Sequence, residues 1–130
     1  MSEMLVPVSP GEVIDKITIL RIKSARMSDA AKLANVRREL ELLERTWRES
    51  AYGRHDISVD ETALQAVNER LWDIEDRIRD QERARSFDAT FIELARSVYI
   101  ENDERAAIKK RINVALGSKI VEEKSYASYR

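Results

Sequence analysis

Apolar residues recur at alternating steps of three and four positions in two stretches of equal length, residues 33–47 and 64–78. This spacing places the apolar side chains along one face of an α-helix. Their positions are Leu33, Val36, Leu40, Leu43 and Trp47 in the first stretch, and Leu64, Val67, Leu71, Ile74 and Ile78 in the second. Because a segment of about eight residues joins the two helices, the pattern predicts an antiparallel hairpin with coiled-coil-like packing.

A further helix is predicted near the start of the chain, where the residues SPGE (9–12) are typical of a helix N-terminus. It should run to about Met27, with Glu12 and Lys16 forming a surface pair one turn apart. Its apolar residues lie on two faces, so we expect it to be central and packed between partners. One face holds Val13, Ile17, Leu20 and Met27, and the other holds Asp15, Ile19 and Ile22.

The last predicted helix begins near Phe87 and ends before Gly117. Its apolar stripe is interrupted by Glu101 and Arg105. Either the helix breaks near Asn102, which makes five helices, or a charged pair faces the interior. The tail is expected to be extended, and its KIV residues could pair with the N-terminal MLVPV as a short β-ribbon. The sequence therefore predicts an all-α bundle of four or five helices with a terminal ribbon.

Composition narrows the class of protein. Only 3 glycines and 2 prolines occur in 130 residues, which favours a single helical domain over residues 1–130. The 23 basic and 24 acidic residues are interspersed and leave a net charge of −1, so we expect no nucleic-acid or membrane partner. No cysteine and one histidine exclude thiol chemistry and histidine-rich metal sites, so no metal or cofactor is expected. No apolar run approaches the roughly 20 residues of a membrane span and no signal peptide is evident, so we expect a cytoplasmic location.

One acidic residue stands out on the predicted first helix. Asp15 lies in line with Ile19 and Ile22 on an apolar face, where an unpaired carboxylate would be costly. It could be a carboxylate that binds a ligand or partner. The alternative, which we favour, is an acid that is stabilised near the helix N-terminus and paired with a nearby arginine.

A polar cluster on the last helix is the second candidate. Arg96, Tyr99, Asn102, Asp103 and Arg105 occur close together in RSVYIENDERAAIKKRIN. Arginines and a tyrosine that converge inside a bundle could hold a carboxylate or a phosphate. The structural alternative is a buried ion network that fixes the helix register. Trp72 lies off its seam, which indicates that another helix or another subunit covers that surface.

Five blocks of the sequence carry a resemblance to a known family. They are VPVSPGEVIDKITIL, KLANVRREL, LWDIED, LARSVYIENDERA and GSKIVEEKSY, and they occur in this order. Together they resemble a small bacterial all-helical family of unknown function. The resemblance implies no activity, but it implies that the two ends of the chain belong to one structural unit.

Two functional families share shorter features with the chain. The all-helical chorismate mutases have a helix similar to IDKI (14–17) with Arg21, but the arginine that usually precedes it is missing here. The all-helical nucleotide pyrophosphohydrolases hold magnesium with paired ExxE and ExxD helices. The chain has ExxD at 12–15 and ExxE at 101–104, but it lacks the doubled glutamate at the helix start.

Two functions are therefore predicted. The first is a non-enzymatic helical interaction module that self-associates, as a homodimer, because the seams are regular and no catalytic constellation is evident. The second is an enzyme or binder of a small anionic molecule, with its site between the first and last helices. Its residues would be Asp15, Arg96, Tyr99, Asn102 and Arg105.

Overall fold

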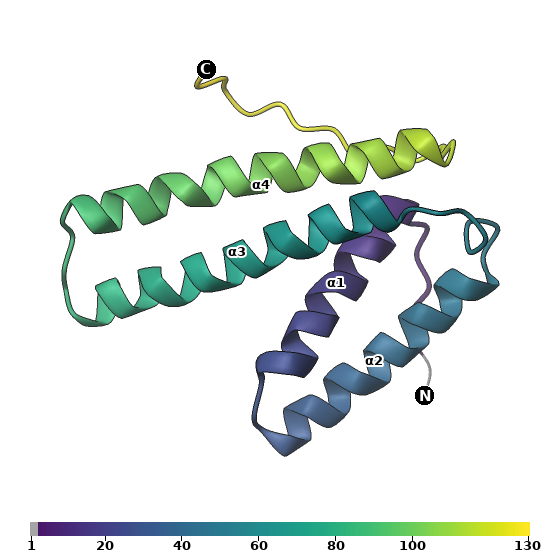
Figure 1. The fold of residues 1–130 in the computed structure, drawn as a ribbon, viewed down its shortest axis with the longest axis horizontal. Helices are drawn as coiled ribbons and strands as arrows, with labels where there is room; N and C mark the ends of the chain where they lie inside the picture. The colour runs from purple at the N-terminus through teal and green to yellow at the C-terminus, as the bar shows by residue number, and fades with distance from the viewer. Residues whose placement is uncertain (1–2) are drawn as a thin grey trace.

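The computed structural model describes residues 3–130, and within them the chain is all-helical (Figure 1). The helices in this part are α1 (Pro10–Arg26), α2 (Ala30–Glu49), α3 (Ser58–Arg83) and α4 (Ala89–Ala115). The predicted all-α bundle is confirmed. Because α4 continues without a break through Asn102, the alternative with five helices is wrong.

The predicted β-ribbon is wrong as well. Residues 3–130 contain no strand, so MLVPV and KIV are separate extended segments. A two-stranded ribbon is marginal in water unless another layer covers one of its faces. The N-terminal segment has no such cover, because Met4 and Leu5 are 87% and 85% exposed. Within the same residues, no helix is long and apolar enough to cross a bilayer.

The start of α1 follows the local sequence. Ser9 is the N-cap, its hydroxyl accepts a hydrogen bond from the Glu12 backbone N–H (3.2 Å), and Pro10 is the first helical residue. The predicted Glu12–Lys16 pair is not formed, because the Glu12 carboxylate accepts from Lys109 Nζ of α4 at 2.7 Å. Lys109 reaches Glu12 from another helix at a site partly shielded from water, so it is a stronger partner than the exposed Lys16 one turn away.

The predicted hairpin has the wrong partners. α2 packs against α1, and α3 packs against α4, whereas no Cα atom of α2 comes within 8 Å of α3 or α4. Figure 1 shows the α1–α2 pair diverging from the α3–α4 pair. A seam of apolar residues shows which side of a helix is buried, but it does not identify the helix that covers it. α1 contacts all three other helices, as its two apolar faces predicted.

The core lies where α1, α3 and α4 meet. Its members are at most 7% exposed, and they are Ile14, Ile17, Leu64, Val67, Leu71, Ile108 and Ile112. From α2, the half-buried Leu40, Leu43 and Trp47 pack against this cluster. The second seam is therefore completed by α1 and α4, and α2 adds its apolar residues to the core beside α1.

α1 and α4 approach each other closely at Gly11. Its backbone N–H donates to the side-chain Oδ1 of Asn113 at 2.7 Å, and Asn113 is only 1% exposed. A Cβ atom at position 11 would lie 2.6 Å from the carbonyl oxygen of Lys109. The missing side chain of Gly11 therefore allows the first helix to touch the backbone of the last one.

Candidate functional site

Asp15 is 6% exposed and fully partnered. Its Oδ1 accepts a hydrogen bond from Asn68 Nδ2 at 2.9 Å, and the same nitrogen donates to Thr18 Oγ1 at 2.9 Å. The nearest base to Oδ2 is Lys109 Nζ at 3.8 Å. The geometry agrees with our interpretation of Asp15 as a paired acid. Its partner is a lysine rather than an arginine.

Lys109 connects three segments of the chain. Its Nζ donates to Glu12 of α1 at 2.7 Å and to Glu122 of the tail at 3.0 Å, and its side chain is 12% exposed. Burial alone would lower the pKa of Lys109, but the hydrogen bonds to the two glutamates and the charge of Asp15 outweigh burial and raise this pKa. Lys109 therefore stays charged at the junction of α1, α4 and the tail.

Arg105 extends the network toward the surface. Its guanidinium donates to Asn68 Oδ1 at 3.1 Å and to Asn102 Oδ1 at 2.6 Å. Both acceptors are neutral amides, and none of the carboxylates in residues 3–130 lies within 4.0 Å of the guanidinium. Asp15, Asn68 and Arg105 thus form a continuous hydrogen-bonded chain from the core to a partly exposed cation, which has no carboxylate within 4.0 Å among residues 3–130.

This cation lines a groove of about 440 Å³ between α1, α3 and α4. The volume falls in the range of small-molecule sites. The lining residues are Ile19 and Lys23 of α1, Asn68, Leu71, Trp72, Glu75, Asp76 and Arg79 of α3, and Asn102 and Arg105 of α4. The groove thus combines an aromatic wall, a short apolar floor and charged groups of both signs.

Trp72 belongs to this groove. The indole is half-buried, and the guanidinium of Arg26 lies 5.9 Å from its ring centroid. Arg26 is held there by an ion pair with Asp73. Part of the surface of Trp72 is therefore covered within the chain, by the end of α1.

No group of three or more metal-ligating side chains occurs within residues 3–130.

The structure separates the predicted site residues. Asn102 and Arg105 line the groove, and Asp15 lies behind it, joined through Asn68. Arg96 is exposed and lies outside the groove, and Tyr99 packs against the tail. Residues three positions apart on a helix drift by about 60° per step, so these four residues of α4 do not share a face.

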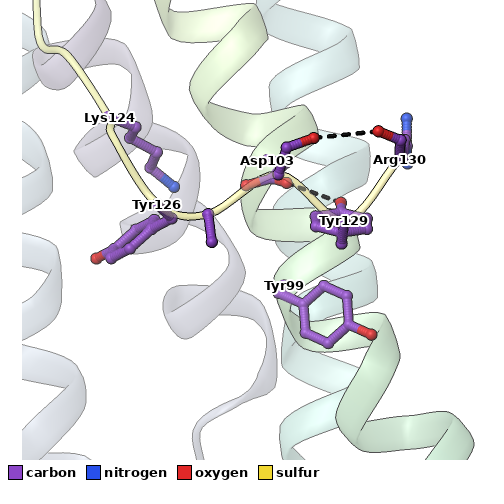
Figure 2. A pocket seen from close by; sticks show the side chains of 8 residues that line it. Tyr99, Asp103, Lys124, Tyr126, Tyr129 and Arg130 are labelled. Carbon is purple, nitrogen blue, oxygen red and sulfur yellow. Dashed lines mark hydrogen bonds between the residues drawn. The ribbon is translucent and has the colours of Figure 1, made fainter.

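The tail, residues 118–130, runs along α4 and forms a second cavity of about 490 Å³ with it. Figure 2 shows Tyr129 of the tail beside Tyr99 and Asp103 of α4. The Tyr129 hydroxyl donates to Asp103 at 2.7 Å, and the rings of Tyr99 and Tyr129 are 4.9 Å apart. The pKa of the Tyr129 hydroxyl is raised, first by this hydrogen bond. Tyr99 therefore packs against the tail of its own chain.

Attachment of the tail should depend on pH through Glu122. The hydrogen bond from Lys109, followed by the lysine charge, lowers the pKa of Glu122. A lowered carboxylate pKa contributes stability that is complete above the unfolded value of about 4.3 and is lost as the pH falls through the folded value. The raised pKa of Lys109 has the opposite sense, because its contribution is complete below about 10.4 and is lost only at higher pH. We expect the tail near Glu122 to detach as the pH falls below the unfolded value and through the lowered folded value.

Amide chemical shifts of residues 118–124, followed by NMR during an acid titration, measure this release. Glu122→Gln should show the shifts of the detached tail already at neutral pH. Glu123→Gln is the matched control, because the contact of Glu123 with Lys110 is exposed on both sides. Unchanged shifts in Glu122→Gln would mean that Lys109 does not anchor the tail.

Two residues of the network were missed in the sequence. Asn68 lies beside the seam, four positions after Leu64 and three before Leu71. The available signal was an amide side chain next to a buried face, because buried polar groups have hydrogen-bond partners. Lys109 was not selected as a site residue, although its position next to Ile108 and three before Ile112 places it near the buried face. Both form contacts with α1, which lies far away in sequence.

Comparison with known proteins identifies a family, but this family has no known function. The model of a family of unknown function, DUF6165, matches residues 4–129. The chain belongs to this family. Membership in DUF6165 confirms the resemblance to an uncharacterised family, while the bacterial origin stays a prediction. No curated protein and no solved structure matches the chain.

Proposed function

We propose that the groove beside Arg105 binds a small molecule with one anionic end, a carboxylate or a phosphate. The observation that carries this proposal is the state of the guanidinium. It is partly buried and held by two amide oxygens, and none of the carboxylates in residues 3–130 forms an ion pair with it. A buried or half-buried charge normally has a partner of opposite sign.

The two amides orient the guanidinium without cancelling its charge. A guanidinium has five N–H donors in a planar fork, and Asn68 and Asn102 accept from two of them. The remaining donors can bind a carboxylate or phosphate in a bidentate manner. Lys23 adds a second positive charge from α1.

The rest of the groove favours a ligand with an apolar or ring-shaped body. Trp72, Leu71 and Ile19 line it, and an indole offers a flat surface for stacking. Glu75 and Asp76 line it too, so they would repel a ligand that carries negative charge along its whole length. Asp15 does not line the groove, so we propose binding and assign it no proton-transfer role.

A thermal-shift series tests this proposal. The probes are inorganic phosphate, pyrophosphate, nucleoside monophosphates and aromatic carboxylates. A ligand at 100 times its Kd should stabilise the protein by about 2.7 kcal/mol. Arg105→Gln should weaken binding roughly 10- to 100-fold, because hydrogen bonds to charged groups contribute about 1.5–3 kcal/mol.

Each variant is compared with its own unliganded protein, since Arg105→Gln also changes the partners of Asn68. Arg96→Gln is the matched control, because Arg96 is an exposed arginine on the same helix but outside the groove. Equal loss of response in both variants, or no response to any probe, would rule the groove out as the anion site.

Self-association is the second candidate function. We infer it from a surface other than the two seams, since α2 packs on α1 and the seam of α3 packs on α1 and α4. Trp72 does not support it either, because it lies in the groove. The observation that favours it is an uncovered stripe on α4.

A further inference from the structure

The outward side of α4 carries an uncovered stripe, which we call the outer stripe and define as Ile100, Glu104, Ala107, Arg111 and Val114. Val114 is 66% exposed, Glu104 and Ala107 are exposed, and Ile100 is half-buried. α3 borders the stripe on one side and the tail on the other. Neither of them covers it.

Two hollows lie along this stripe, one on each side of Ala107. The first has a volume of about 400 Å³ and includes Ile100 and Glu104. The second has a volume of about 540 Å³ and includes Arg111 and Val114. Ala107 lines both of them. A small residue therefore separates two depressions that could each receive the side chains of a facing helix.

The charges on the stripe are arranged antisymmetrically about Ala107. Asp103 and Glu104 lie four and three positions before it, and Lys110 and Arg111 lie three and four positions after it. The apolar residues are symmetric instead, with Ile100 seven positions before Ala107 and Val114 seven positions after it. When a second copy of the stripe is turned end to end against the first, acids face bases and apolar residues face apolar residues.

We propose that the outer stripe binds a second copy of this chain, with the two α4 helices antiparallel and crossing at Ala107. A two-fold axis at this point places Glu104 opposite the partner's Arg111 and Asp103 opposite the partner's Lys110, and each pair occurs twice. Ile100 then faces the partner's Val114. This inference rests on self-association, the second candidate function, and is independent of the ligand groove.

Glu104 is available for this interface in one chain, whereas Asp103, Lys110 and Arg111 already have partners within it. None of the bases in residues 3–130 forms an ion pair with Glu104. Arg111 pairs with Asp60 at 3.1 Å and Lys110 with Glu123 at 3.4 Å, and both bases are about half exposed. Such exposed pairs contribute little and rearrange easily. Arg130 borders the hollow near Glu104, which places the chain end at the edge of the interface.

Sedimentation velocity on the full chain tests the proposal by charge reversal. The wild type should sediment as a dimer. Glu104→Arg places arginine opposite the partner's Arg111, and Arg111→Glu places glutamate opposite the partner's Glu104. Each reversal acts twice in a two-fold dimer, so each should raise the dissociation constant roughly 10- to 100-fold.

Mixing the two variants restores both pairs, so an equimolar mixture should sediment as a heterodimer. Glu41→Arg, a reversal of an exposed acid on α2, is the matched control and should remain dimeric. Circular dichroism checks that the variants are folded. If loss of the Asp60 pair unfolds Arg111→Glu, then Ala107→Glu, which changes an exposed residue at the crossing point, replaces it and should give monomer.

The outcomes separate the interface from self-association itself. A monomeric wild type overturns both. A dimer that neither reversal weakens overturns the outer stripe and leaves self-association through another face. Variants that become monomeric but do not recombine on mixing overturn the antiparallel pairing of Glu104 with the partner's Arg111.

Discussion

Replacing Lys109 with methionine should lower the free energy of unfolding by about 3 kcal/mol at neutral pH, since removing one partner of a buried ion pair leaves a buried charge uncompensated. Asp15 would keep its hydrogen bond from Asn68 but would lose the only base within 4.0 Å among residues 3–130. Glu12 and Glu122 would lose the same partner. Urea denaturation followed by circular dichroism measures the change.

Lys16→Met is the control for this experiment. Lys16 is an exposed lysine of α1 that forms no ion pair within residues 3–130. Its replacement should change stability by no more than about 0.5 kcal/mol. Adding Asp15→Asn to Lys109→Met should recover part of the loss, because the carboxylate is then neutral. Equal stabilities for Lys109→Met and Lys16→Met would show that Asp15 needs no positive partner.

Gly11→Ala should destabilise the protein by about 2–4 kcal/mol, which combines overpacking with the loss of a buried hydrogen bond. The new Cβ would lie 2.6 Å from the backbone oxygen of Lys109, and backbone cannot yield as a side chain can. The shift would also weaken the bond from the Gly11 N–H to Asn113. Alanine's better helix propensity would offset about 1 kcal/mol of this.

Thermal and urea unfolding of Gly11→Ala can be compared with those of Lys16→Ala, an exposed position on the same helix. The control should lie within about 0.5 kcal/mol of the wild type. Combining Gly11→Ala with Asn113→Ala removes the side-chain contact but leaves the clash with Lys109 backbone. If this double variant were as stable as Asn113→Ala alone, the backbone approach would not be the reason for glycine.

Local features of the fold could be predicted from the sequence. The apolar period identified the helices, and Ser9, Pro10 and Gly117 marked ends that the structure confirms, with Gly117 at φ 66°. The packing partner of α2 could not be predicted, since any apolar face can complete its seam. α1 offered apolar residues on both sides, and it contacts α2, α3 and α4.

The candidate site divides in the same way. Asn102 and Arg105 were selected as members of the polar cluster on the last helix, and they lie together in the groove. The partners of Asp15 could not be predicted, because Asn68 and Lys109 reach it from other helices, 53 and 94 positions away. Periodicity describes one helix at a time and contains no information on such distant contacts.

The contact between Gly11 and Asn113 also constrains the order of folding. It joins residues 102 positions apart, whereas the α1–α2 and α3–α4 pairs are built from neighbours in sequence. Closing so long a loop costs more entropy than closing either hairpin, so the hairpins can form first and dock afterwards. On the ribosome, synthesis runs from the N-terminus, so the first helix emerges long before α4. Until then, α1 and α3 lack the cover that α4 provides, and the nascent chain exposes part of its future core.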